Sequence, residues 1–221
     1  MACRSLRWAP LKSPGKLVSK IVVLCEGDTE ELAVRHFIAP QWIAEGLGSV
    51  GLQPRNLNGK PQNAGKFAGL YLDEQDVLGV FTLVDLQGTK LVVHQPQDDL
   101  DTKVQRVRES LRGQVNHARA NSFFPHVCVH QTEAWILAEG HALAARLGDP
   151  NIRSDSNAEL KNFQNPPSER LNERFLRIKK RRYHKIGDGT PLFKAMEFQP
   201  VYNSCQYFRE IYDDLKAVGN R

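Results

Sequence analysis

The stretch Lys20-Ile21-Val22-Val23-Leu24-Cys25, followed directly by Glu26-Gly27-Asp28-Thr29-Glu30-Glu31, decides the fold. Its first half is apolar and rich in β-branched residues, as expected for a strand that is buried on both faces. Its second half leads into a helical pattern, and the spacing of Asp28 and Glu31 predicts a capping box at the helix start. Strand, tight turn and helix in this order indicate an α/β domain.

The pattern of apolar residues repeats this alternation along the chain. Pro40 is expected to end or kink the first helix, because proline lacks an N–H and clashes with the preceding turn. The pattern predicts further strands over 49–57, 80–84 and 123–130, with a brief extension over 90–93. It predicts further helices over 64–75, 98–114, 133–139 and 205–218, with Thr132 as the N-cap of the third of these.

Strands that alternate with helices predict a Rossmann-like, mainly parallel sheet flanked by helices, with a small helical C-terminal part. We divide the chain into three segments on this basis. We expect residues 1–18 to form a flexible lead-in, residues 19–145 the α/β core, and residues 146–221 a helical region that carries a basic segment. The lead-in has no continuous apolar core of the kind a signal peptide needs.

Composition excludes several classes of protein. The 221 residues are 41% hydrophobic and 25% charged, which is typical of a folded domain with its own core. No apolar run approaches the roughly 20 residues that span a membrane. The four cysteines form no CxxC pair, so a disulfide scaffold or zinc ribbon is not expected, and a reducing, cytoplasmic location is favoured.

The net charge of +5 is unevenly distributed. Residues 170–185 hold eight basic residues and one acid, a net charge of +7, which leaves −2 for the rest of the chain. Clustered cations can bind a nucleic-acid backbone by releasing counterions, and Tyr183 and His184 could stack on a base. The residues expected to contact DNA or RNA are Lys179, Lys180, Arg181, Arg182, Tyr183 and Lys185. The alternative is a solvated helix face whose cations pair with the acidic remainder of the protein.

Acidic residues follow three of the predicted strands. Glu26 and Glu30 follow the first, Asp85 follows the second of the strongly apolar strands, and Glu133 follows the third. The carboxyl ends of parallel strands meet at one edge of a sheet, so these side chains could converge there. Carboxylates are preferred ligands of Mg²⁺. For any single acid, helix capping or solvation is the competing interpretation, but Glu26 and Asp85 directly follow fully apolar strands.

The histidines and cysteines indicate a function less clearly than the acidic residues do. His126 and His130 flank a strand, and we interpret both as structural, although His130 lies close to Glu133 in sequence. Cys25 lies at the end of an apolar strand, where a buried, inert thiol is expected. The chain has no HExxH, GxSxG or GxxxxGK[ST] motif, which leaves zinc-protease, serine-hydrolase and P-loop chemistry without support.

The ordered motifs resemble a known family. IVVLCEGDTEEL and GVFTLVDLQG are similar to the Toprim pattern, in which a glutamate-glycine turn follows the first strand and an aspartate-x-aspartate motif follows a later one. With FFPHVCVHQTEAWILAE, RRYHKIGDGTPLFKAM and CQYFREIYDDL, the chain resembles the bacterial Toprim-like family called "domain of unknown function 4276" over residues 20–217.

The resemblance implies a Toprim-like fold and cleavage of DNA or RNA that depends on Mg²⁺ or Mn²⁺. It implies catalytic roles for Glu26, Asp85 and Lys185, with Lys185 at the scissile phosphate. Metal ligands would come from Glu26, Glu30, Asp85 and Glu133. The fold analogy also implies defence against phage or mobile elements, and a partner ATPase, because this chain has no nucleotide loop of its own.

One position departs from the family pattern. The second acid of the aspartate-x-aspartate motif is Gln87, which offers a carbonyl oxygen but no charge. This departure weakens the case for a two-metal mechanism. It also favours an alternative, a non-catalytic module whose acidic site binds nucleic acid or a partner protein. A small-molecule phosphoesterase is a third hypothesis that the acidic edge permits.

Overall fold

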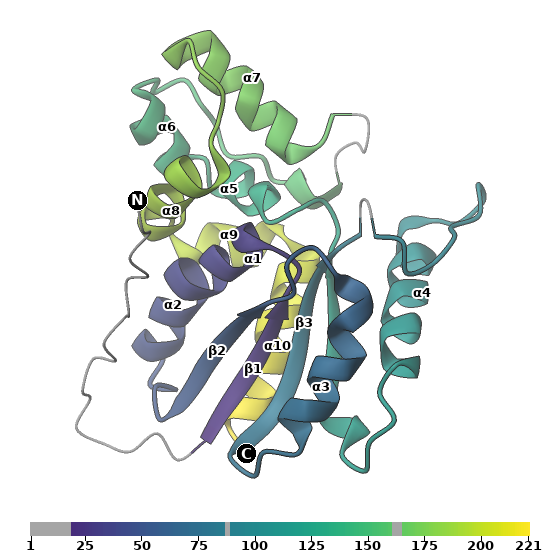
Figure 1. Cartoon of the computed structure of the whole chain (residues 1–221). Helices are drawn as coiled ribbons and strands as arrows, with labels where there is room; N and C mark the ends of the chain where they lie inside the picture. Colours follow the sequence, from purple (N-terminus) through teal and green to yellow (C-terminus); the bar gives the residue numbers. More distant parts are fainter. Residues whose placement is uncertain (1–18, 87–88, 161–164) are drawn as a thin grey trace, which may run out of the picture.

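The computed structural model describes residues 19–86, 89–160 and 165–221. Its centre is a four-stranded parallel sheet in the order β2-β1-β3-β4 (Figure 1). The strands are β1 (Ser19–Cys25), β2 (Val50–Asn56), β3 (Val77–Asp85) and β4 (Phe123–Cys128). This arrangement confirms the α/β fold and the parallel sheet expected from the sequence. The lead-in predicted for residues 1–18 lies outside the described residues.

Strand β1 is apolar from Ile21 to Cys25, because helices cover both faces of the sheet there. Ile21, Val23 and Cys25 belong to one hydrophobic cluster, and Val22 and Leu24 belong to another. This division follows from the two-residue period of a strand, which turns successive side chains to opposite faces. All five side chains are at most 2% exposed.

One face of the sheet is covered by helices α3 (Ala64–Leu72) and α4 (Leu100–Gly113). The other face is covered by the helical segment that follows β1 and by the C-terminal helix α10 (Gln206–Gly219) (Figure 1). Helix α10 contributes Phe208, Ile211, Tyr212 and Leu215 to the same core cluster as β1. One hydrophobic core therefore includes residues from both sides of the boundary that we placed at residue 145.

The helical segment after β1 runs continuously through α1 (Asp28–Ala33), a π-helical turn η1 (Val34–Ile38) and α2 (Ala39–Ala44). Of the two effects expected of Pro40, an end or a kink of the helix, the end is contradicted, because the helix continues through α2. Pro40 lies in the first turn of α2, directly after the π-helical turn. A proline at that position is tolerated because the N–H that it lacks has no α-helical partner in a first turn.

Five further helices gather over the carboxyl ends of the strands (Figure 1). They are α5 (Glu133–Glu139), α6 (His141–Leu147), α7 (Pro167–Lys179), α8 (Lys185–Ala195) and α9 (Phe198–Ser204). Helix α8 packs against α1 and η1, and α5 packs against α9 within this set. The C-terminal helices therefore form a layer over the sheet edge at which we expected the site. Short 3₁₀ turns lie between β2 and α3, between α4 and β4, and between α6 and α7. They are η2 (Pro61–Asn63), η3 (Ala120–Ser122) and η4 (Ala158–Leu160).

Two local predictions are wrong. Residues 90–93 form bends and coil, and not a strand, because β4 already takes the sheet position beside β3. The capping box of α1 is shifted by one residue, since Gly27 is the N-cap and its N–H donates to Glu30 Oε2 at 3.0 Å. Thr132 is the N-cap of α5, as predicted, although its side chain makes no capping hydrogen bond.

Among the described residues, no helix combines the length and the apolar character that are needed to cross a membrane.

Candidate functional site

The sheet edge brings Glu26 and Asp85 together. Strands β1 and β3 are neighbours, and the Glu26 N–H continues their ladder by donating to the Leu83 carbonyl at 3.0 Å. The Asp85 N–H donates to Glu26 Oε2 at 2.9 Å. Burial raises the pKa of the half-buried Glu26, and the Asp85 N–H and the charge of Lys185 counteract this rise. The Glu26 carboxylate thus lies over the point at which β3 ends.

Glu30 has a structural partner as well as a place at this edge. Its carboxylate accepts from the Gly27 N–H and so helps to start α1. It is 8% exposed. Burial, followed by the charge of Glu133, raises its pKa to about 7. The capping alternative therefore holds for Glu30, while its sensitivity to Glu133 places the two carboxylates in one electrostatic site.

Glu133 is the most deeply buried acid of the set. It is the first residue of α5, it is 0% exposed, and neither carboxylate oxygen has a hydrogen-bond partner among the described residues. Its nearest cation is Lys185, whose Nζ lies 3.6 Å from Glu133 Oε1. Burial raises the pKa of Glu133 and the Lys185 charge opposes that rise. A buried carboxylate with this little compensation is costly unless a cation or a proton joins it.

Lys185 connects the acids of this edge. It is the first residue of α8, and the contact between α8 and α1 carries it to the sheet edge. Its positive charge lowers the pKa of Glu26, of Glu30 and of Glu133. The fold thus brings a lysine of the basic segment within electrostatic reach of three of the four predicted acids, although about 50 residues or more separate it from each of them in sequence.

The carboxylate oxygens at this edge are ligands of the kind that hard cations such as Mg²⁺ or Mn²⁺ prefer. The oxygens of Glu133, which have no hydrogen-bond partner among the described residues, also favour a cation. Within residues 19–86, 89–160 and 165–221, no three His, Cys, Asp or Glu side chains are close enough to hold a metal ion together. Magnesium needs fewer, since it commonly binds through one or two carboxylates and keeps several waters. The edge therefore fits a metal held by two side chains, not a closed cage.

The basic segment divides into exposed and engaged cations. Lys179, Lys180 and Arg182 are exposed at the end of α7 and in the turn after it. Arg181 is engaged, because its guanidinium binds both oxygens of Asp188, at 2.6 and 2.7 Å, and lies 5.2 Å from the centre of the Phe175 ring. Arg181 is thus part of the scaffold, and the other three cations offer the surface charge.

The prediction that Tyr183 stacks on a base is wrong. Tyr183 is 8% exposed, and its ring packs against Phe175 with a centroid distance of 5.4 Å. Its N–H donates to Asn172 Oδ1 at 3.0 Å, which fixes the backbone as well. No ring face is open to a base, because the turn folds inward beneath α7. His184 is exposed, but its Nδ1 accepts from the Gly187 N–H at 2.9 Å and so caps α8.

Asp188 is a residue of this region that sequence reasoning missed. It is 1% exposed and accepts from Arg181, from Arg146 at 2.9 Å and from the His184 N–H at 3.0 Å. Burial raises the pKa of Asp188, but the hydrogen bonds from Arg181, from the His184 N–H and from Arg146, in this order of size, bring it well below its usual range. An acid just after a run of cations was the available signal. Asp188 holds the turn that places Lys185.

The histidines and Cys25 behave as expected from the sequence. His126 is 4% exposed, stacks on Phe81 and binds Asp214 Oδ2 through Nε2 at 3.0 Å, which is a structural role. His130 is 1% exposed, and burial lowers its pKa. Cys25 is fully buried, and burial raises the pKa of its thiol, which makes it a poor nucleophile.

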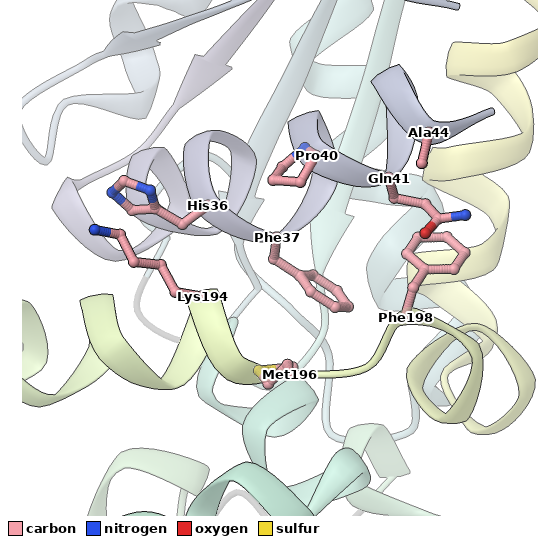
Figure 2. A pocket seen from close by; sticks show the side chains of 8 residues that line it. All are labelled: His36, Phe37, Pro40, Gln41, Ala44, Lys194, Met196 and Phe198. Atoms are coloured by element: carbon pink, nitrogen blue, oxygen red, sulfur yellow. The ribbon is translucent and has the colours of Figure 1, made fainter. Parts of the chain in front are cut away.

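A pocket of about 490 Å³ lies elsewhere, between the π-helical turn with α2 and the α8–α9 connection (Figure 2). Its lining residues are His36, Phe37, Pro40, Gln41, Ala44, Lys194, Met196 and Phe198. It contains none of the residues predicted for the site. The acidic edge therefore remains the candidate site on chemical grounds.

The parallel sheet, the acids at its carboxyl edge and the helical layer above them define a Toprim-like α/β domain. The pattern of the family described as "Domain of unknown function (DUF4276)" matches residues 25–216, and the chain belongs to this family. No curated protein matches it in sequence.

The chain is similar to solved structures of C-terminal regions of OLD proteins. The C-terminal region of the Burkholderia pseudomallei OLD protein aligns with a TM-score of 0.50 and 15% identity, over 91% of this chain and 98% of that one. The C-terminal region of the Xanthomonas campestris pv. campestris OLD protein aligns with a TM-score of 0.42 and 15% identity, over 90% and 98%. The Burkholderia structure supports the fold, whereas the Xanthomonas alignment is too loose to add to it.

Proposed function

We propose that this protein is a metal-dependent phosphodiesterase that cleaves DNA or RNA. The observation that carries the proposal is the approach of Lys185 Nζ to within 3.6 Å of the buried Glu133, at the edge that Glu26 and Asp85 share. A cation-binding edge and a lysine for a phosphate are thereby combined in one place. The likeness to a C-terminal region of an OLD protein, a Toprim-type domain, supports a nuclease-like or nucleic-acid-related role.

Each residue of the edge has a task in this proposal. Mg²⁺ or Mn²⁺, when bound by acids from the set Glu26, Glu30, Asp85 and Glu133, would stabilise charge on the phosphate and activate a water. Lys185 binds a non-bridging oxygen of the scissile phosphate. Glu26, whose pKa is raised by burial, exchanges a proton with the attacking water or the leaving oxygen.

The exposed cations Lys179, Lys180 and Arg182 lie a few residues before Lys185 in the chain. We assign them to the phosphate backbone that flanks the scissile bond, where they bind without sequence preference. Arg181 supports them indirectly by holding the turn through Asp188. A role in defence against phage, a partner ATPase and a cytoplasmic location extend the same analogy and are part of the proposal.

A nuclease assay with Mg²⁺ or Mn²⁺ tests the proposal. Wild type is expected to cleave single- or double-stranded DNA or RNA, and chelation is expected to stop cleavage. Glu26→Gln, Asp85→Asn and Lys185→Met are each expected to lower the rate by about 100-fold or more, as expected for the loss of a group that stabilises charge in the transition state. Lys194→Met, on the same helix but at its far end, is the matched control and should cleave like wild type.

Equal cleavage by wild type and the three site variants would contradict the catalytic proposal. Binding of nucleic acid without cleavage under any metal would favour the non-catalytic module that Gln87 suggests. Gln87 itself lies outside the described residues.

A further inference from the structure

The pocket of about 490 Å³ lies apart from the acidic edge and has no role in the proposed function (Figure 2). One wall is formed by η1 and α2, and the other by the end of α8 and the segment that leads into α9. Lys185 and Lys194 lie at opposite ends of α8, about 14 Å apart along the axis of an α-helix. Ligand pockets in proteins commonly have volumes of about 300–1,000 Å³, so this pocket is large enough for a small molecule.

One end of the pocket presents two basic side chains without a partner. Figure 2 shows His36 and Lys194 at the same end, with the Lys194 ammonium beside the imidazole. Neither side chain makes a hydrogen bond or an ion pair with another described residue, and none of the described residues that line the pocket is acidic. Burial lowers the pKa of His36, and the charge of Lys194 lowers it further. A bound anion would compensate both groups.

The rest of the pocket is mainly apolar and is held in place by the core. Phe37, Met196 and Phe198 line it, as Figure 2 shows. Phe37 is only 4% exposed, and the centre of its ring lies 5.8 Å from that of Phe198. The Phe198 ring in turn lies 4.5 Å from that of Tyr212, a residue of the core. An aromatic or aliphatic group would therefore pack against a preformed surface.

The backbone of one wall is unusual as well. His36 and Phe37 lie in the π-helical turn η1, at whose end the Ala39 N–H donates to the carbonyl of Val34, five residues earlier. Pro40 follows Ala39 and has no N–H to donate to the His36 carbonyl. Single π-helical turns within helices are rare and frequently occur at functional sites. Two lining residues thus come from a backbone feature that is associated with function.

We propose that this pocket binds a small organic anion with an aromatic or apolar body. His36 and Lys194 bind the anionic group, which is a carboxylate or a phosphate monoester. Phe37, Met196 and Phe198 pack against the body of the ligand. The inference does not rest on the proposed function, because no residue of the acidic edge lines the pocket.

Met196 makes binding in the pocket observable by NMR. The chain has two methionines, Met1 and Met196, so protein labelled with ¹³C in the methionine methyl groups gives two signals, which Met196→Leu assigns. The Met196 signal reports on the pocket, and the Met1 signal is the internal reference. Phenyl phosphate and phenylacetate are the probes, since each joins an aromatic body to one of the two anionic groups. Phenol and inorganic phosphate are the controls, since each lacks one half of the ligand.

We expect phenyl phosphate or phenylacetate to shift the Met196 signal in a saturable way, and the tighter of the two identifies the anionic group. Its affinity should be at least tenfold higher than that of phenol or inorganic phosphate, because it alone occupies both ends of the pocket. Lys194→Gln removes the charge and should weaken binding about tenfold, as expected for the loss of a hydrogen bond to a charged group. Lys66→Gln, at an exposed lysine on α3, is the matched control and should bind like wild type.

Any of three results overturns the inference. The first is the absence of a saturable shift of the Met196 signal with both anions. The second is an affinity for phenol or inorganic phosphate equal to that for the aromatic anions, and the third is equal binding by Lys194→Gln and Lys66→Gln. Cleavage of nucleic acid enters none of these results, so a failure of the proposed function and a failure of this inference are distinguishable.

Discussion

Glu30 shows at the scale of one residue how a site acid and a structural acid can be the same group. It caps α1 through the Gly27 N–H and it senses the charge of Glu133. Sequence reasoning identified Glu30 as a site residue from its place after the first strand. It assigned the cap to Asp28 and Glu31 instead, because glycine has no side chain to signal an N-cap.

Glu30 predicts a dependence of stability on pH. The pKa of its carboxyl is about 7 in the folded protein, against an ordinary value of 4.5. Between these values the folded state keeps a proton that the unfolded chain has released, so the free energy of unfolding falls as pH rises from about 4.5 to about 7. At about 1.4 kcal/mol per pKa unit, the contribution is at most about 3 kcal/mol.

Glu30→Gln keeps an oxygen for the Gly27 N–H and removes the titration. Urea unfolding at pH 5 and pH 8 should show that the free energy of unfolding of the variant rises relative to that of wild type at the higher pH. A difference between variant and wild type that is the same at both pH values would show that Glu30 is not the group responsible.

The N-terminus of helix α10, a single element, is capped by an acidic side chain that is distant in sequence. Glu159 is 3% exposed and accepts from the Tyr207 and Phe208 N–H groups at 3.0 and 3.2 Å, and from Trp135 Nε1 at 3.2 Å. These two N–H groups belong to the first turn of α10, which has no side-chain cap from Cys205. Sequence reasoning placed the helix correctly and missed this cap, because 46 residues separate Glu159 from Cys205.

Glu159→Ala leaves three buried donors without an acceptor. At about 1–3 kcal/mol for each unsatisfied group, partly relieved by water, we expect a loss of about 3 kcal/mol in the free energy of unfolding. Glu159→Gln, which keeps one acceptor oxygen, should lose less. Thermal or urea unfolding measures both, and Glu169→Ala on the exposed face of α7 is the control. A Glu159→Ala protein as stable as the control would contradict this assignment.

At the scale of the whole molecule, the strand-end acids and the basic segment come from different layers. Glu26 and Asp85 lie at the carboxyl ends of β1 and β3, and the basic segment runs from α7 to the start of α8. Figure 1 shows α7 and α8 above this edge of the sheet. The sequence predicted the parallel sheet, because β1 and β3 are mostly apolar runs and the strands alternate with helices. It could not predict that Lys185 meets Glu133 or that Tyr183 is buried, because both depend on how α8 packs against α1 and how the preceding turn folds beneath α7.

The charge separation predicts how nucleic-acid binding responds to salt. Alanine at Lys179, Lys180 and Arg182 should flatten the plot of log K against log salt concentration by about 2 to 3, at about 0.9 per phosphate contact. Alanine at three exposed cations of other elements, Lys66 on α3, Arg112 on α4 and Arg221 beside the Phe124 ring, should leave the slope unchanged. An unchanged slope in the first variant would remove the basic segment from the binding surface.

In the proposed function, the carboxyl edge of the sheet binds a divalent cation between Glu26 and Asp85. The anomalous scattering of a crystal soaked in Mn²⁺ measures this directly. We expect a manganese peak about 2 Å from an oxygen of each side chain, and its loss in Glu26→Gln. A wild-type crystal with no manganese at this edge under saturating Mn²⁺ would contradict it.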